Sequence, residues 1–233
     1  MILTAAVVVG ALAASVPRQR GGPTGTGPES ETALLVEDFS GHDADRRWRD
    51  GERHGQWHAV YNGYGTTTIS AADGHWLMMS PRAAGEPRVT HAGLVTTVRE
   101  FSDLDLTTRM RTVRQLRSEK PNTWEAAWLL WHYTDDEHFY SVVLKPNGWE
   151  LGKEDPAYPG AQRFLTTGDQ PTFPIGTPHT VRVRHVGNSI TVWANGRLLT
   201  TYTDEERPYG RGRIGLYTED AEVAFDSVIV QRP

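Results

Sequence analysis

The 233-residue sequence contains no cysteine, which excludes disulfide bonds, a cysteine nucleophile and thiolate metal ligands. It has no excess of positive charge: 24 Lys and Arg residues face 29 Asp and Glu residues, for a net charge of −5. Binding to DNA or RNA is therefore not expected. Lysine is scarce, since only Lys120, Lys145 and Lys153 accompany 21 arginines. Codon bias in a GC-rich genome explains this imbalance, yet it directs attention to each lysine.

Long apolar runs are also rare. The run at residues 2–16 ends in small residues, as the apolar region and cleavage zone of a secretory signal do, although no Lys or Arg precedes it. It is shorter than the roughly 20 residues that span a bilayer; an uncleaved anchor is the alternative. Residues 17–33 are rich in Gly, Pro and Thr and predict a flexible linker. We expect a secreted protein without stable membrane insertion, with one folded domain over residues 34–231.

Amphipathic helical patterns are absent from this domain. Short β-branched and aromatic runs recur instead, separated by Gly, Asn, Pro or Asp, and Asn195–Gly196 is a strong hairpin signal. The predicted strands are 34–39, 66–70, 75–80, 92–100, 103–113, 124–133, 138–145, 148–153, 180–186, the two halves of 189–202, 212–217 and 222–230. This number of short strands predicts an all-β fold, a two-sheet antiparallel β-sandwich or jelly roll.

The most aromatic part of the chain is the run WEAAWLLWHY at residues 124–133. A strand that is apolar on both faces is expected to be central, with its second face covered or lining a groove. Lys145 and Lys153 follow on the next two predicted strands. Flat rings with interleaved polar groups suit the C–H faces of sugars, so this cluster predicts contact with carbohydrate. An ordinary sandwich core is the alternative.

Four segments of the sequence resemble a known group of proteins. The order LLVEDFSG, AADGHWLMM, HTVRVRHVGNSITVWANGRLL and GRIGLYTEDAEVAFDSVIV is similar to the concanavalin A-like jelly-roll domains of secreted carbohydrate-active proteins, over nearly all of residues 34–230. These segments bear on fold more than on activity. The central stretch from WEAAWLLWHY to GAQRFL resembles the glucuronan lyases, which cleave β-1,4-linked polyglucuronate. The 3-keto-glycoside hydrolase domains share the terminal segments and are a competing assignment.

A glucuronan lyase needs groups that neutralise the C6 carboxylate of the uronide, a base for the C5 proton, and an acid for the departing O4. A groove that collects cations and an aromatic ring would bind such an anionic polymer. The candidate substrate-binding residues are Arg109, Arg111, Trp131, Lys145, Lys153 and Gln162. For the arginines, the alternative is that they only solubilise the outside of a sheet.

Proton transfer is assigned to polar groups near the start of the domain. The segment 54–64 (HGQWHAVYNGY) is interpreted as a loop on a rigid sandwich, where such groups gather. We expect His58 and Tyr61 to form the acid–base region, with Tyr140 in reserve. These roles follow from chemistry and spacing.

An ordinary glycosidase would need two carboxyl groups about 5 to 9.5 Å apart. Glu125 and Glu150 are available, but they lie on different predicted strands. Glu154 reads as a loop or turn residue. Hydrolysis by two carboxyl groups therefore ranks below elimination.

The resemblance also implies a metal. Concanavalin A-like jelly rolls often hold a structural Ca²⁺ where the first and last strands meet, and calcium prefers oxygen ligands. The candidate ligands are Glu37, Asp38, Asp73 and Asp226. Turn formation at Asp73 and surface exposure elsewhere is the alternative.

Together these observations predict a secreted, monomeric polysaccharide lyase with calcium, acting on an acidic, β-linked polyuronide similar to glucuronan. Two alternatives remain open. One is a carbohydrate-binding jelly-roll module without catalysis, and the other is a glycoside hydrolase of the 3-keto-glycoside hydrolase type.

Overall fold

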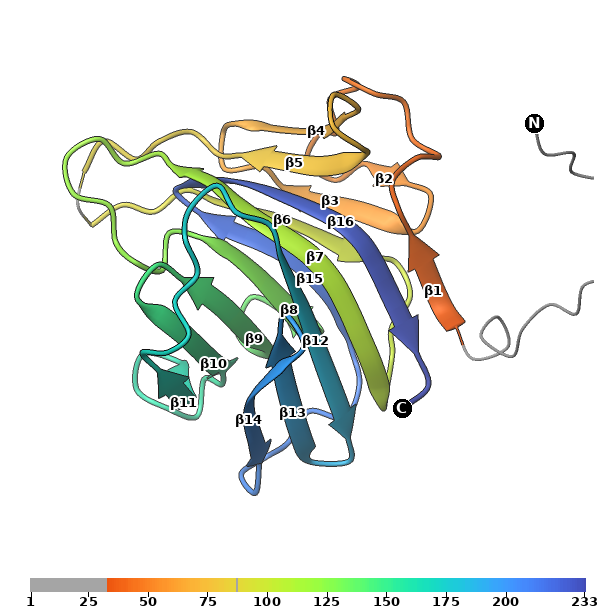
Figure 1. Cartoon of the computed structure of the whole chain (residues 1–233), viewed down its shortest axis with the longest axis vertical. Coiled ribbons are helices and arrows are strands. Elements are labelled where there is room, and N and C mark those ends of the chain that lie inside the picture. The colour runs from red at the N-terminus through yellow and green to blue at the C-terminus, as the bar shows by residue number, and fades with distance from the viewer. Residues whose placement is uncertain (1–32, 87) are drawn as a thin grey trace, which may run out of the picture. The chain divides into compact units, whose positions relative to one another are not determined.

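The computed structural model describes residues 33–86 and 88–233, and all of its regular structure is β-strand. The predicted signal segment 2–16 and the linker up to residue 32 lie outside the described residues, so secretion stays a prediction. No helix in the described part is long and apolar enough to cross a membrane. The strands form two sheets in which every neighbouring pair is antiparallel, which confirms the predicted all-β sandwich (Figure 1).

The first sheet, here called sheet A, is ordered β14-β13-β12-β7-β16-β5-β4, and β1 pairs with β16. The first and last strands of the domain therefore lie side by side, as Figure 1 shows near the C-terminus. Its strands are β1 (Ala33–Glu37), β4 (Thr66–Ser70), β5 (Trp76–Ser80), β7 (Leu104–Gln115), β12 (His179–Val186), β13 (Ser189–Ala194), β14 (Arg197–Thr203) and β16 (Ala221–Gln231).

The second sheet, sheet B, is ordered β11-β10-β9-β8-β15-β6-β3-β2. Its strands are β2 (Arg53–His54), β3 (Trp57–Tyr61), β6 (Ala92–Thr97), β8 (Ala127–Asp135), β9 (His138–Lys145), β10 (Gly148–Glu154), β11 (Gln162–Gly168) and β15 (Arg213–Glu219). Two of these elements differ from expectation. The segment predicted as a loop at 54–64 forms β2 and β3, and Gln162, which lies outside the predicted strands, begins β11.

The main core lies between the two sheets. Sheet A covers it with one face only: in β12, Val181 and Val183 are buried and alternate with exposed Arg182 and Arg184. This alternation is typical of an antiparallel sheet with one solvated face. The Asn195–Gly196 turn joins β13 and β14 with positive φ at both residues, which confirms the predicted hairpin.

Sheet B is covered on both faces at its centre. Along β8, Leu129 and Trp131 point into the main core, whereas Trp128 and Leu130 belong to a second apolar cluster on the outer face. The predicted central position of this strand is confirmed, since β8 lies between β9 and β15. The outer face of sheet B is therefore not a plain solvated surface, and the apolar cluster on it borders a pocket.

Candidate active site

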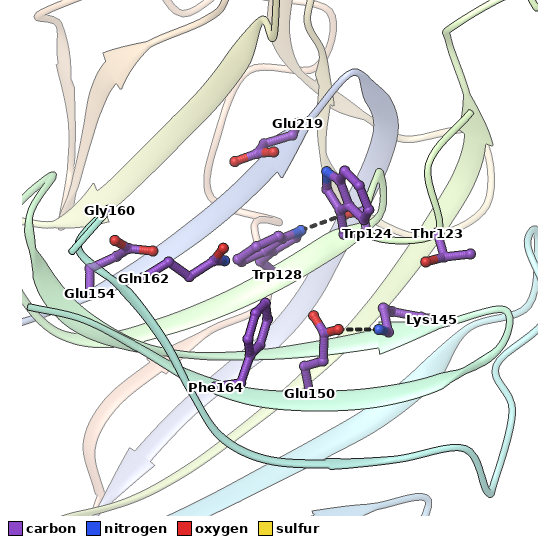
Figure 2. A pocket seen from close by; sticks show the side chains of 10 residues that line it. All are labelled: Thr123, Trp124, Trp128, Lys145, Glu150, Glu154, Gly160, Gln162, Phe164 and Glu219. Carbon is purple, nitrogen blue, oxygen red and sulfur yellow. Dashed lines mark hydrogen bonds and ion pairs between the residues drawn. The ribbon is translucent and has the colours of Figure 1, made fainter. Parts of the chain in front are cut away.

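A pocket of about 500 Å³ opens on the outer face of sheet B, beside the β8–β11 half of the sheet. Aromatic, acidic and amide side chains share its walls (Figure 2). The residues that line it are Thr123, Trp124, Trp128, Lys145, Glu150, Glu154, Gly160, Gln162, Phe164 and Glu219. A cavity of this size and mixed polarity is typical of sites for small ligands.

The β9–β10 hairpin places the polar side chains of one wall. Gly148 pairs with Lys145 and Glu150 pairs with Val143, so Lys145 and Glu150 share the outer face. The ammonium group of Lys145 forms an ion pair with the Glu150 carboxylate (Figure 2). Glu154 lies four residues after Glu150 on β10, and its side chain therefore extends from the same face. The hairpin therefore delivers two carboxyl groups and one cation to the pocket.

Three aromatic rings form the apolar part of the pocket. Trp128 is only 5% exposed, whereas Trp124 and Phe164 are 43% and 55% exposed. The indole N–H of Trp128 donates a hydrogen bond of 2.8 Å to the carbonyl of Trp124, which joins two of the rings through the chain (Figure 2). Exposed rings beside polar groups are suited to stacking against sugar rings.

Two carboxyl groups of the pocket have raised pKa values. Burial, and then the negative charge of Glu219, raise the pKa of Glu154 to about 7. Burial also raises the pKa of Glu219, while the hydrogen bond that the Tyr217 hydroxyl donates at 2.7 Å opposes this rise. The charges of Asp220 and Glu125 raise it further. Near neutral pH, Glu154 can thus carry a proton while Glu219 accepts a hydrogen bond.

Such a pair can transfer protons in both directions. Carboxyl groups with perturbed pKa values in one pocket are a usual sign of acid–base chemistry. The pocket is also acidic as a whole, because Glu150, Glu154 and Glu219 outnumber Lys145. This charge does not favour an anionic ligand.

Comparison with known proteins identifies the family. A model described as the 3-keto-alpha-glucoside-1,2-lyase-like domain matches residues 39–231. The chain belongs to this family. A search of curated proteins finds no match.

Three of the solved structures with similar folds are named as carbohydrate-active proteins; their identity to this chain is 10–14%, which bears on the fold alone. The CBM66 carbohydrate-binding module from Bacillus subtilis has a TM-score of 0.58 and 14% identity, over 76% of this chain and 95% of that one. A glycoside hydrolase family 16 protein from Bacteroides ovatus has a TM-score of 0.55 and 10% identity, over 84% and 99%. A structure named as a native glycosidic hydrolase has a TM-score of 0.56 and 13% identity, over 85% and 95%.

The protein is therefore a carbohydrate-active jelly-roll domain, similar to glycoside hydrolases and binding modules. The predicted membership of the concanavalin A-like carbohydrate-active group is confirmed. Within it, the family match is to the competing assignment rather than specifically to the glucuronan lyases.

Of the predicted site residues, Lys145 and Gln162 line the pocket of this family member. His58 and Tyr61 lie on β3, four strands away from β9 in sheet B. The Tyr61 hydroxyl donates a hydrogen bond of 3.1 Å to Asp136. The pKa of Tyr61 is raised, mainly by burial and next by the negative charge of Asp136. Burial, with the charges of Arg53 and Arg213, lowers the pKa of His58. The structure does not place these two residues in the pocket wall.

Three predicted site residues point into the main core instead, which is a correction. Trp131, Tyr140 and Lys153 are all buried between the sheets. Trp131 donates its indole N–H to His185 at 2.9 Å, and the Tyr140 hydroxyl donates to Asp204 at 2.6 Å. The reason is that successive side chains of a strand point to opposite faces of the sheet. Each of the three lies an odd number of positions from the pocket residue on its own strand, which is Trp128, Lys145 or Glu154, and so points to the other face. The structure therefore places these three side chains on the face of sheet B opposite the pocket, not in its wall.

Arg109 and Arg111 lie on sheet A and cannot share a groove with Lys145. Their guanidinium groups lie 4.8 Å and 5.0 Å from the ring centre of Trp76, and Arg109 also pairs with Asp226 at 3.5 Å. These contacts agree with the alternative interpretation, in which the arginines solubilise the outside of a sheet.

The predicted calcium ligands are not brought together. Glu37 accepts hydrogen bonds from Trp57 and His42, Asp38 accepts from Ser40, and Asp226 faces Arg109. In residues 33–86 and 88–233, no group of three or more His, Cys, Asp or Glu side chains is arranged to hold a metal ion. The residues present therefore do not fit the expected site, although the first and last strands do meet as predicted.

Sequence reasoning missed the two most informative carboxyl groups. The sequence predicts a loop or turn at Glu154, but this residue ends β10 on the face opposite Trp149 and Leu151. Extending the alternation of this strand by one residue would have found it. Glu219 carries no such signal, because its approach to Glu154 depends on how β15 lies across sheet B.

Proposed function

We propose that this pocket binds an uncharged glucoside and cleaves it by acid–base chemistry, with Glu154 as the acid and Glu219 as the base. One observation carries the proposal: two half-buried carboxyl groups line a pocket with aromatic walls, and the pKa of Glu154 is raised to about 7. A general acid works best when its pKa lies near the working pH. The hydrogen bond from Tyr217 opposes the rise that burial causes in the pKa of Glu219, and so acts in favour of the ionised form that a base needs.

The charge of the pocket supports an uncharged substrate over polyglucuronate. Lys145 is the single cation among the pocket-lining residues, and it is already paired with Glu150. Even with Glu154 protonated, a uronate brought to this wall would meet the charges of Glu150 and Glu219 and no free cation, so its own charge would be repelled. The pocket thus lacks the surplus of positive charge that elimination from a uronide demands.

The family description supports a 3-keto-α-glucoside as the substrate. A ketone at C3 makes the C2 proton acidic, as the C6 carboxyl group does for C5 in a uronide. In the proposed step, Glu219 removes the C2 proton, the electron pair forms the C1–C2 double bond, and the C1–O bond breaks. Glu154 gives its proton to the departing oxygen. The elimination expected from the sequence is retained, but no cation is needed to neutralise the substrate.

The aromatic side chains would orient the sugar. Trp124 and Phe164 are exposed beside the carboxyl groups and offer stacking surfaces for the ring. Gln162 supplies an amide that can donate to and accept from hydroxyl groups. The buried ring of Trp128 excludes water from one side of the pocket, which strengthens the charge effects there.

The test uses an α-linked glucose disaccharide oxidised to the ketone at C3. Elimination produces a double bond conjugated with the ketone, which is detected by near-ultraviolet absorbance, together with free glucose. We expect Glu154→Gln and Glu219→Gln each to lower kcat/KM by about 100-fold or more. Glu100→Gln is the matched control, because Glu100 is an exposed carboxylate that pairs with Arg211.

Three other results would count against this proposal. Binding of the keto-glucoside without any product would indicate a carbohydrate-binding module, the class to which the similar Bacillus subtilis structure belongs by its name. An unsaturated product from polyglucuronate, with none from the keto-glucoside, would restore the glucuronan lyase interpretation. Equal activity of the Glu154→Gln and Glu100→Gln variants would exclude Glu154 as the acid.

A further inference from the structure

The side chain of Arg117 joins three segments of the chain behind the pocket wall, and it is only 10% exposed. Its Nε donates to Oε1 of Glu125 at 2.7 Å, and its Nη2 donates to Oδ2 of Asp220 at 2.7 Å. Its remaining donors reach the carbonyls of Glu86 at 2.9 Å and Val89 at 3.1 Å. One guanidinium group therefore holds the loop before β6, the loop before β8 and the turn after β15.

The first consequence concerns Glu219, which directly precedes Asp220. Asp220 has a positive φ of 42° in the turn between β15 and β16, a conformation that non-glycine residues rarely adopt. Its Oδ1 accepts the backbone N–H groups of Ala84 and His91, at 3.0 Å and 3.3 Å. With Arg117 on its other oxygen, this carboxylate fixes the turn and so fixes where β15 presents Glu219.

The second consequence concerns Trp124, which directly precedes Glu125. Oε1 of Glu125 accepts hydrogen bonds from Arg117 and, at 2.9 Å, from the side-chain amide of Asn122. The carbonyl of Asn122 in turn accepts a hydrogen bond of 2.6 Å from Gln115, at the end of β7. Trp124 lies inside this short anchored segment, so its ring is held at the pocket rim.

We propose that Arg117 is the positioning residue of the pocket: it fixes Glu219 and Trp124 on one wall and offsets the charges of Glu125 and Asp220 beside Glu219. Arg117 itself does not line the pocket. The role of Glu219 as a base rests on the proposed function, but the positioning of both pocket residues by Arg117 does not.

The charges around Glu219 make this role measurable. The groups that face it are the Tyr217 hydroxyl on its own strand, the Tyr61 hydroxyl on β3, Asp220 in the turn, Glu125 in the loop before β8, and Glu154 on β10. Oε2 of Glu125 is buried and has no hydrogen-bond partner among the described residues. Arg117 is thus the main group that offsets the Glu125 and Asp220 charges, and its loss would expose Glu219 to both.

The experiment follows the ionisation of Glu219 in the full chain without substrate, by carbon-13 NMR of labelled glutamate carboxyl groups. The signal is assigned with Glu219→Gln. In Arg117→Gln we expect the pKa of Glu219 to rise and the indole signals of Trp124 and Trp128 to move. Arg211→Gln is the matched control, because Arg211 forms an exposed ion pair with Glu100; it should change neither signal.

A second variant gives the opposite sign. Glu125→Gln removes a negative charge and keeps Arg117, so the pKa of Glu219 should fall. Arg117→Lys keeps the positive charge but cannot form the forked hydrogen bonds. The pKa of Glu219 in this variant should therefore lie close to its wild-type value, while the indole signals of Trp124 and Trp128 stay displaced as in Arg117→Gln. An unchanged Glu219 titration in Glu125→Gln would overturn the proposal even if Arg117→Gln does not fold. Absence of glucoside cleavage, with these shifts present, would instead overturn only the proposed function.

Discussion

Two lysine–carboxylate pairs lie on opposite faces of sheet B and differ in what surrounds them. Inside, Lys153 is fully buried and donates to Asp204 at 2.7 Å and to the carbonyls of Glu206 and Arg207. Outside, Lys145 pairs with Glu150 at the wall of an open pocket. The inner pair has all its donors engaged by protein, whereas the outer pair keeps donors available for a ligand. The same chemistry is structural on one face and accessible for binding on the other.

The hairpin register decides this difference. Lys145 lies opposite Gly148, so odd-numbered residues of β9 share a face with even-numbered residues of β10. Lys153 is odd-numbered and therefore faces away from Lys145, although the two are only eight positions apart. Proximity in sequence indicated one shared site, but strand alternation separates it into two.

The largest expected effect is the loss of stability when the inner pair is broken. Lys153→Met leaves Asp204 buried without its cation, and we expect it to lower the free energy of unfolding by about 3–5 kcal/mol. Lys145→Met is the matched change on the outer face. Water in the pocket can solvate Glu150, so this variant should lose only about 1–2 kcal/mol. Urea unfolding measures both; equal losses would contradict the contrast between the two faces.

The next largest effect is on sugar binding, and it compares a tryptophan on the outer face of sheet B with one on the outer face of sheet A. Trp124→Ala removes an exposed ring from the pocket, and we expect it to weaken binding of the keto-glucoside about tenfold. Trp193 is half-buried on sheet A beneath the guanidinium group of Arg182, 4.9 Å from its ring centre. Trp193→Ala should leave binding unchanged. Calorimetric titration checks this, and weakened binding in both variants would mean that the sugar site is not confined to the pocket.

The sequence predicts the fold better than the site, for a physical reason. Alternation in β12 and the Asn195–Gly196 turn are local signals, so strands and hairpins could be read directly. The scarcity of lysine and the neighbouring aromatic residues indicate Lys145, whereas Gln162 is indicated by its residue type as a partner for a sugar carboxylate. Trp131 was misplaced because a strand buried on both faces gives no pattern that distinguishes the inside from the outside.

The partnership of Glu154 and Glu219 could not be predicted at all. The two residues belong to β10 and β15, which are separated in sheet B by β9 and β8. Their interaction depends on the order of the strands and on the curvature of the sheet, and local sequence patterns predict neither property. The same holds for Arg117, whose partners are 8 and 103 positions away.

The smallest expected effect concerns the pH dependence of stability, where the two faces have opposite signs. Burial alone would raise the pKa of Asp204, but hydrogen bonds from Lys153 and Tyr140 lower it, so its stabilising contribution is present above its unfolded pKa and is lost in acid. Glu154 behaves in the opposite way: its pKa rises from 4.5 to about 7 on folding. Between these pH values the native state binds more protons than the unfolded state, so the contribution of Glu154 to stability falls as the pH rises.

Glu154→Gln removes this titration from the outer face. We expect the free energy of unfolding of the variant, relative to the wild type, to increase by about 1 kcal/mol between pH 5 and pH 8, because the half-exposed carboxyl is partly solvated. Urea unfolding at the two pH values measures the change, and Glu100→Gln serves as the control because its carboxylate is exposed in both states. A difference between variant and wild type that stays constant with pH would show that Glu154 titrates as an ordinary carboxyl group. In that case the acid of the pocket would have to be sought in Glu219 instead.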